Sequence, residues 1–166
     1  MKIAQGIQVS IDNGNTWYKL SDHNRMPVQT SYEIIESARR MANGTLRKYV
    51  VAKKRKVSSE WNNFPTLDSN LVDYSTGGRA AAWMKAFYES NVYQPVLVKL
   101  VYARETVPTQ NTVPADNTYV DALHSASDTF YAYITNFSYD VEKRMVSVGT
   151  STGIDYTAVK IEFTEI

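Results

Sequence analysis

The alternation of hydrophobic and polar residues predicts a chain built mainly from β-strands. Residues 7–11 and 156–166 alternate with a period of two, which is typical of a strand with one buried face. Residues 129–143 alternate in the same way, which places Tyr131, Tyr133, Thr135, Phe137, Tyr139 and Val141 on one side of a strand. Residues 96–104 are apolar at nearly every position, so we expect them to lie centrally in a sheet.

A tight turn divides residues 3–21 into a predicted hairpin. Asn and Gly in the run 12–15 accept the positive φ values that such turns require. Residues 10–17 have the form S-x-D-x-G-x-T-W and resemble the Asp-box hairpin of sialidase-type propellers. The resemblance implies that the Asp, Ser and Thr form hydrogen bonds in the turn and that the Trp packs beneath it. A chain of 166 residues is too short for several four-stranded blades, so we interpret the motif as a structural hairpin rather than a glycosidase feature. The residues assigned to it are Asp12, Gly14, Thr16 and Trp17.

Residues 30–43 fit two structures. Thr30 and Glu33 match a capping box followed by helical spacing, whereas Asn43-Gly44 is a strong hairpin signal. We favour an extended segment that enters a hairpin at Asn43-Gly44. Two further strands are expected within 45–64, with the basic run 53–56 between or along them, and Pro65 should end the pairing.

Residues 77–90 are predicted to form one α-helix. Ser75 or Thr76 can cap its start, Asn91 can stop it, and one apolar stripe should dock on a sheet. One helix among many strands favours an antiparallel β-sandwich or barrel, mainly β, with a flanking helix. We expect a single domain over 1–166, with a polar loop insertion at 105–128. The predicted core includes Trp61, Trp83, Phe87 and Leu100.

Composition narrows the possible functions. The chain has no cysteine, which excludes disulfides, thiolate zinc sites and cysteine nucleophiles. Its net charge of +1 does not fit a dedicated nucleic-acid binder. No apolar run approaches the roughly 20 residues that span a bilayer, and the first residues do not form a signal peptide. We therefore expect a soluble protein made in a cytoplasm, without membrane contact.

Motifs that would indicate catalysis are weak. Residues 149–153 match G-x-S-x-G, but that motif needs a following helix and a later histidine, and a strand is predicted after it. His23 and His124 lie far apart in predicted loops, with no other histidine or cysteine to complete a metal site. We expect no catalytic residues, no metal, no cofactor and no enzymatic activity.

Charge is distributed unevenly along the chain. Residues 37–59 form a predicted basic hairpin arm without an acidic residue, whereas residues 105–166 carry nine acidic and three basic residues. A solvated charged hairpin, phosphate contact with nucleic acid, and pairing between copies of the chain all fit this pattern. We favour pairing between copies, because a nucleic-acid binder needs no compensating acidic half. The basic residues of the arm are Arg39, Arg40, Arg47, Lys48, Lys53, Lys54, Arg55 and Lys56.

Several short runs together resemble the small structural proteins of tailed-bacteriophage tails, of the tail-tube and minor-tail type. The resemblance rests on residues 39–48, the run 54–61, a helix that follows Gly77-Gly78, an apolar strand, and the carboxyl-terminal Phe-Thr-Glu-Ile. It covers about 7–104 and the last strand, and the segment 105–128 lies outside it.

The resemblance implies a tail-tube-like subunit that assembles into rings, often of sixfold or threefold symmetry, around a channel that conducts DNA. The basic arm would then reach a neighbouring subunit or face the channel. The expected partners are copies of the chain in a hexamer or trimer and other tail proteins, with passing contact to phage DNA. The expected location is the virion tail, after assembly in the host cytoplasm. A carbohydrate- or host-surface-binding β module is the alternative, and a small glycosidase is a third.

Overall fold

The computed structural model describes residues 4–102, 128–144 and 153–166. One α-helix, α1 (Ala81–Asn91), and two 3₁₀ turns, Asp68–Asn70 and Tyr74–Thr76, occur in this part of the chain. The mainly β class with one helix is therefore confirmed. The strands are β1 (Ala4–Ser10), β2 (Tyr18–Leu20), β3 (Gln29–Arg40), β4 (Leu46–Pro65), β5 (Gly78–Arg79), β6 (Val96–Tyr102), β7 (Thr129–Arg144) and β8 (Asp155–Glu165).

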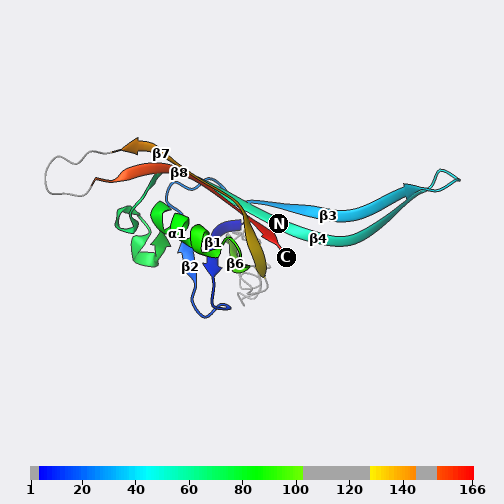
Figure 1. Cartoon of the computed structure of the whole chain (residues 1–166), viewed down its shortest axis with the longest axis horizontal. Helices are drawn as coiled ribbons and strands as arrows, with labels where there is room; N and C mark the ends of the chain where they lie inside the picture. Colours follow the sequence, from blue (N-terminus) through cyan, green and yellow to red (C-terminus); the bar gives the residue numbers. More distant parts are fainter. Residues whose placement is uncertain (1–3, 103–127, 145–152) are drawn as a thin grey trace, which may run out of the picture.

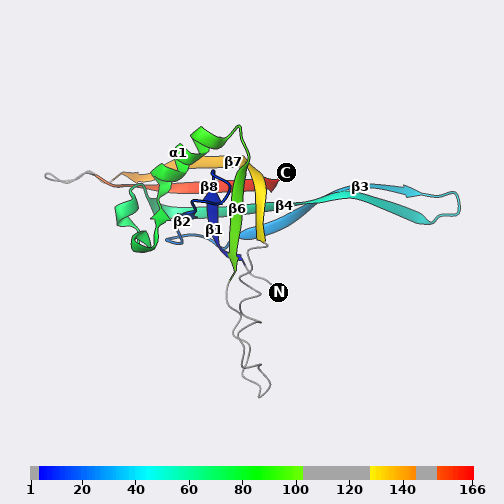
Figure 2. The same ribbon diagram turned by 90° about the horizontal axis from the view of Figure 1, so that it is seen from below.

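All of these strands belong to one sheet, which folds back on itself. The strand order is β3-β4-β8-β7-β6-β1-β2-β5, and every neighbouring pair is antiparallel except β2 and β5. Figure 2 shows β1 and β6 crossing over β4 and β8, so the two halves of the sheet lie across each other. α1 lies on the same side of β7 and β8 as β1 and β6 (Figure 1).

The hydrophobic core lies between these layers. β4, β6 and β8 each contribute alternate side chains to it, as their period of two predicts. α1 adds Met84 and Phe87, and its Tyr88 ring stacks on Phe137 of β7 with centroids 4.7 Å apart. The hairpin predicted for residues 3–21 is confirmed by the antiparallel pairing of β1 with β2.

The prediction of two strands within 45–64 is wrong, because β4 is one strand of 20 residues. β3 pairs with its first part and β8 with its second part, so the strand needs no turn to satisfy its backbone. The basic run 53–56 therefore lies inside the strand. A register shift between Trp61 and Phe64, with Asn63 at a φ of 47°, bends the strand near its end, and Pro65 is its last residue.

The predicted faces of β7 are half wrong. Phe130, Ala132 and Ile134 are buried, whereas Tyr131 and Tyr133 are exposed. The register against β8 shifts between Ile134 and Asn136, and beyond that shift Phe137 and Tyr139 pack against the core. One extra residue in a strand exchanges its two faces, so a continuous alternation in the sequence does not correspond to one continuous face.

The helix begins later than predicted, and neither Ser75 nor Thr76 caps it. Both residues lie in a 3₁₀ turn or at its end, and β5 then pairs with β2 before the helix starts. The carboxylate of Asp68 accepts a hydrogen bond from the Ala80 N–H at 2.6 Å and so takes the place of a local cap. Asn91 ends the helix as predicted, and its amide donates to the Phe87 carbonyl at 2.8 Å.

Candidate functional site

The most conspicuous feature is a two-stranded ribbon that projects from the body (Figure 1). β8 pairs with β4 only from Lys56 onwards, so residues 32–55, named here the hairpin arm, pair with no third strand among the described residues. A turn at 41–45 closes the ribbon, with Gly44 at a φ of 80° and the Met41 N–H donating to the Thr45 carbonyl at 2.8 Å. The extended form and the turn at Asn43-Gly44 are therefore confirmed.

The pairing register fixes which residues share a face of the arm. Even-numbered residues of β3 share a face with Val50, Lys48 and Leu46, and odd-numbered ones with Tyr49 and Arg47. At a register shift between Ile35 and Glu36, Val51 is an extra residue in β4, so the positions of β4 that share a face with even-numbered residues of β3 change there from odd to even. The even face continues the core face of the body beyond the end of the core.

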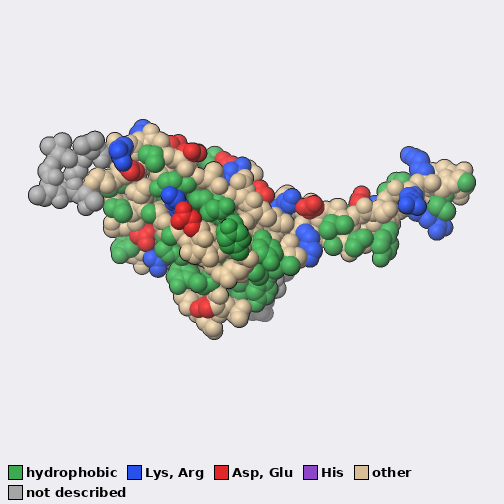
Figure 3. Space-filling view, in the orientation of Figure 1, with side chains coloured by type: hydrophobic (Ala, Val, Ile, Leu, Met, Phe, Trp, Pro, Cys, Tyr) green, Lys and Arg blue, Asp and Glu red, His purple; other side chains and the backbone are tan. Residues whose placement is uncertain are grey.

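Hydrophobic side chains that the sequence analysis did not single out as functional cover this arm. Eight large apolar residues are between 45% and 70% exposed, and Figure 3 shows hydrophobic side chains along the arm with Lys and Arg near its tip. Apolar residues at such positions are equally expected inside a core, so the sequence carried no signal that these residues face solvent. They are Tyr32, Ile34, Ile35, Met41, Leu46, Tyr49, Val50 and Val51.

The basic residues at the base of the arm have partners within the chain. Lys54 donates to the carbonyl of Ile166, and the backbone N–H of Arg55 donates to the Glu165 carboxylate at 2.9 Å. The Arg55 guanidinium also lies over the Phe130 ring, 4.7 Å from its centroid. These residues therefore help to anchor the arm on the body.

Three lysines of β4, one at the junction with the body and two along the arm, contact residues of β3. Lys56, at the junction with the body, lies 2.9 Å from Glu33, which raises the pKa of the lysine, and Lys48 lies 2.5 Å from Glu36. Lys53 lies over the Tyr32 ring, 4.0 Å from its centroid. Both glutamates lie in β3 before residue 37, outside the acid-free window 37–59. The net positive charge counted over that window is therefore larger than the net charge of the folded ribbon.

Near the tip the register places two arginines directly opposite each other. Arg39 of β3 pairs with Arg47 of β4, and Arg40 donates to the Gly44 carbonyl at 3.2 Å. Like charges on directly opposed strand positions are destabilising. The tip therefore carries the concentrated positive charge that the sequence predicted for the whole arm.

The structural hairpin forms the hydrogen bonds that its motif predicts. Asp12 accepts from the Ser10 hydroxyl at 2.7 Å and from the Thr16 N–H at 2.8 Å, and the Gly14 N–H donates to the Ser10 hydroxyl at 3.0 Å. Gly14 has a φ of 88°, and the Trp17 ring lies beneath it. These bonds close the turn of the hairpin.

The Asp12 carboxylate makes this turn sensitive to acid. Hydrogen bonds from Thr16 and from the Ser10 hydroxyl lower the pKa of Asp12 to about 2 in the folded protein, from an ordinary value of 3.8. The stabilisation is present above pH 3.8 and is lost as the pH falls through about 2. We expect Asp12→Asn to lower the urea midpoint at neutral pH, with a difference that closes towards pH 2. An equal difference at both pH values would contradict this role of the charge.

The other sequence-predicted residues are placed as follows. Trp61, Phe87 and Leu100 are buried, and Trp83 is half-buried and stacks on Phe87. The backbone N–H of His23 donates to the Ser21 hydroxyl at 3.0 Å. His124, most of the segment 105–128 and residues 149–152 of the G-x-S-x-G run lie outside the described residues.

The part of the chain that the structure describes contains neither a group of three potential metal ligands nor a membrane-spanning helix. Across 4–102, 128–144 and 153–166, no three histidine or acidic side chains are grouped to hold a metal ion. No helix within these ranges is long and apolar enough to cross a bilayer.

Comparison with known proteins gives one finding at the level of structure. No protein-family model matches the chain, and no curated protein matches its sequence. Among solved structures, it is similar to a chain described as "Tail of empty GTA particle computed with helical refinement, C6 symmetry". The two share 7% identity at a TM-score of 0.47, over 99% of this chain and 90% of the other.

Proposed function

We propose that this protein is a non-enzymatic structural subunit of a phage-type tail and acts by self-assembly into rings or tubes through its hairpin arm. The sequence resemblance to tail-tube and minor-tail proteins supports the class. The exposed apolar side chains of the arm support the mode of action. The location would be the virion tail, with assembly in the host cytoplasm.

The observation that carries the proposal is a two-stranded ribbon that no other strand of the described chain covers, with apolar side chains on both faces. Isolated two-stranded hairpins are marginally stable in water, and contiguous exposed apolar patches mark interaction sites. Residues 46–55 span about 33 Å at 3.3 Å each, and a ribbon about 10 Å wide then offers about 650 Å² over two faces. Each partner of a standard interface buries about 800 Å² of its surface. The arm alone would therefore supply most of the area that one partner of a stable interface needs.

Copies of the same chain are the partners that the charge distribution favours. The basic arm and the acidic residues of 105–166 have opposite signs in a chain of net charge +1. A head-to-tail contact between unlike surfaces closes into rings or continues as a tube. A ring of six or three copies, contacts with other tail proteins and passing contact with DNA belong to this proposal.

A paired substitution tests the role of the arm. Ile34→Asp with Val50→Asp places two charges on the even face of the arm. The side chains of Ile34 and Val50 are 45% and 49% exposed in the single chain. We expect the wild type to sediment as large assemblies and this variant as a monomer with an unchanged far-ultraviolet circular dichroism spectrum, because only exposed side chains change. Negative-stain imaging should show rings or tubes for the wild type alone.

A control on the body separates a local effect from a general one. Val72, between the two 3₁₀ turns, is 80% exposed, so Val72→Asp adds charge without touching the arm. This variant should assemble as the wild type does. A wild type that stays monomeric at high concentration, with or without other tail proteins, would overturn the proposed function.

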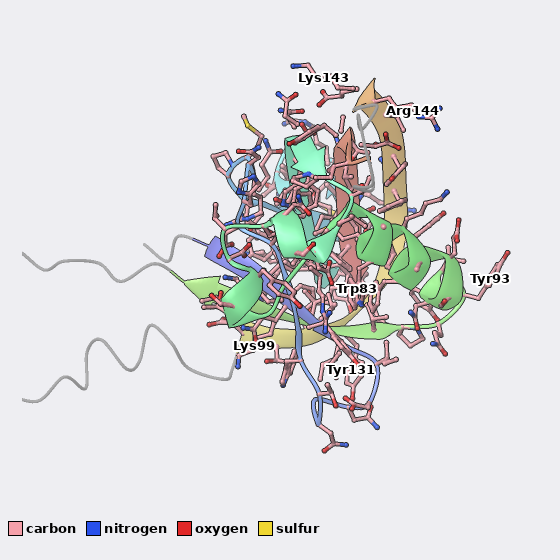
Figure 4. The ribbon with its side chains drawn as sticks, turned by 90° about the vertical axis from the view of Figure 1, so that its left-hand side faces the viewer. Trp83, Tyr93, Lys99, Tyr131, Lys143 and Arg144 are labelled. Carbon is pink, nitrogen blue, oxygen red and sulfur yellow. The ribbon has the colours of Figure 1, made fainter. Side chains whose placement is uncertain are left out.

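A carbohydrate-binding module is the second candidate, and exposed tyrosines favour it. Tyr93 is 94% exposed at the end of the helix, and Tyr131 is exposed on β7 (Figure 4). Exposed aromatic rings can stack on sugars. Binding on a glycan array that Tyr131→Ala abolishes would favour this candidate over assembly.

A further inference from the structure

Three residues near the tip of the arm share one face and form an unusual group. Arg39 and Arg47 are directly opposed. Tyr49 pairs with Ser37 and lies two residues from Arg47 along β4, so it is on the same face as Arg47. Tyr49 is 70% exposed. We name Arg39, Arg47 and Tyr49 the tip cluster.

No acidic group within the described residues neutralises the tip cluster. No carboxylate of that part of the chain lies within 4.0 Å of either guanidinium. The two glutamates of the arm are already engaged, Glu33 by Lys56 and Glu36 by Lys48, and Glu36 lies on the opposite face. Two opposed arginines repel each other, so this arrangement becomes favourable when an anion from another molecule lies between them.

The chemistry of the tip cluster suits a planar or tetrahedral oxyanion. Each guanidinium presents a rigid fork of N–H donors that matches a carboxylate or a phosphate, and the Tyr49 hydroxyl adds a further donor. The surroundings distinguish these two ligands. Leu46, Val50 and Met41 are exposed on the same segment, and such apolar groups are typical of a protein–protein interface. Protein surfaces that bind nucleic acid are usually much more basic.

We propose that the tip cluster binds a side-chain carboxylate on the surface of a second copy of this chain. This inference rests on the proposed function and deepens it, because it assigns the partner group at the end of the arm. The apolar side chains of the arm supply contact area, and the tip cluster sets where along the neighbouring copy the tip comes to rest. An arm bound at another position would leave both arginines buried and unpaired. This cost favours one position of the arm on the neighbouring copy over the others.

Charge reversal with a matched control tests the site. Arg39→Glu with Arg47→Glu reverses the tip cluster, and Lys143→Glu with Arg144→Glu makes the same change in charge at the end of β7, away from the arm (Figures 1 and 4). Sedimentation velocity over a range of concentrations, at low and high salt, measures the assembly constant. We expect the tip variant to weaken assembly about a hundredfold and the control variant to match the wild type.

Conservative substitution refines the assignment. Arg39→Lys with Arg47→Lys keeps the charge but loses the bidentate fork, and we expect about tenfold weaker assembly. Wild-type assembly should also weaken at high salt. If the charge-reversed variant assembles as the wild type does, the proposed binding of a carboxylate by the tip cluster is overturned, and the proposed function stands.

A phosphate ligand predicts a different result. Binding of the wild type to a fluorescent DNA duplex, lost in the charge-reversed variant while assembly is unchanged, would overturn the carboxylate assignment in favour of nucleic acid. A wild type that never assembles would overturn the proposed function and the second-copy ligand together. The two failures are therefore distinguishable.

Discussion

Replacing Trp61 by alanine is expected to lower the free energy of unfolding by about 3–5 kcal/mol, a large part of the stability of a small domain. The side chain is fully buried and stacks on Phe64, with ring centroids 5.7 Å apart. Its indole N–H donates to the Ser21 carbonyl at 2.8 Å, which ties β4 to the segment after β2. Urea unfolding followed by circular dichroism measures the loss.

Trp61→Phe separates the two contributions of this residue. Phenylalanine keeps most of the apolar contact but leaves the Ser21 carbonyl without its donor, which costs about 1–3 kcal/mol. The phenylalanine variant should therefore lie between the wild type and the alanine variant. A loss below about 1 kcal/mol in Trp61→Ala would show that the site collapses around the missing ring and that Trp61 is not central to the core.

Gly78→Ala is expected to destabilise the protein by about 2–3 kcal/mol, although it adds one methyl group. A Cβ at this position would lie 2.5 Å from the carboxyl carbon and one carboxylate oxygen of Asp73, too close for any real contact. The carboxylate cannot move freely, because it accepts from the Ser21 hydroxyl at 2.7 Å and from the Asp22 N–H at 2.9 Å. Lys19 lies 3.3 Å from the same carboxylate.

A double-mutant cycle identifies the cause of that loss. Burial alone would raise the pKa of Asp73, but hydrogen bonds from Asp22, Ser21 and Lys19 lower it, so the charged carboxylate is the form that the fold holds. In an Asp73→Ala background the obstructing carboxylate is gone, and Gly78→Ala should then cost little. Equal costs in both backgrounds, measured by urea unfolding, would contradict a steric origin.

The length of β4 fits the proposed role of the arm as a contact between subunits. The strand is anchored at one end by Trp61 and Phe64, which are fully buried, and at the other it forms half of the arm. A continuous strand leaves no hinge of irregular backbone between body and arm, so the arm leaves the body in a defined direction (Figure 1). Lys54 and Arg55 reinforce this direction by contacts with Ile166 and Glu165 at the carboxyl end of β8. A neighbour would then meet a ribbon of preset position.

The sequence by itself determined the features that depend on local chemistry. Period-two alternation predicted β1 and β8, the Asn-Gly pair predicted the turn of the arm, and the Asp-box motif predicted the bonds of Asp12. Each of these follows from neighbours within a few residues, which is the range over which turn geometry and side-chain alternation act. The basic charge of residues 37–59 could also be seen in the sequence.

Only the tertiary structure decided which faces are covered and which charges are paired. Apolar residues occur both in a strand inside a core and in a projecting ribbon, so the exposure of Ile34 and Tyr49 depends on where β8 stops pairing with β4. The register shift in β7 exchanged its faces without any mark in the hydrophobic pattern. Strand pairing brought Glu36 to Lys48 and set Arg39 against Arg47, because cross-strand neighbours are chosen by register rather than by distance along the chain.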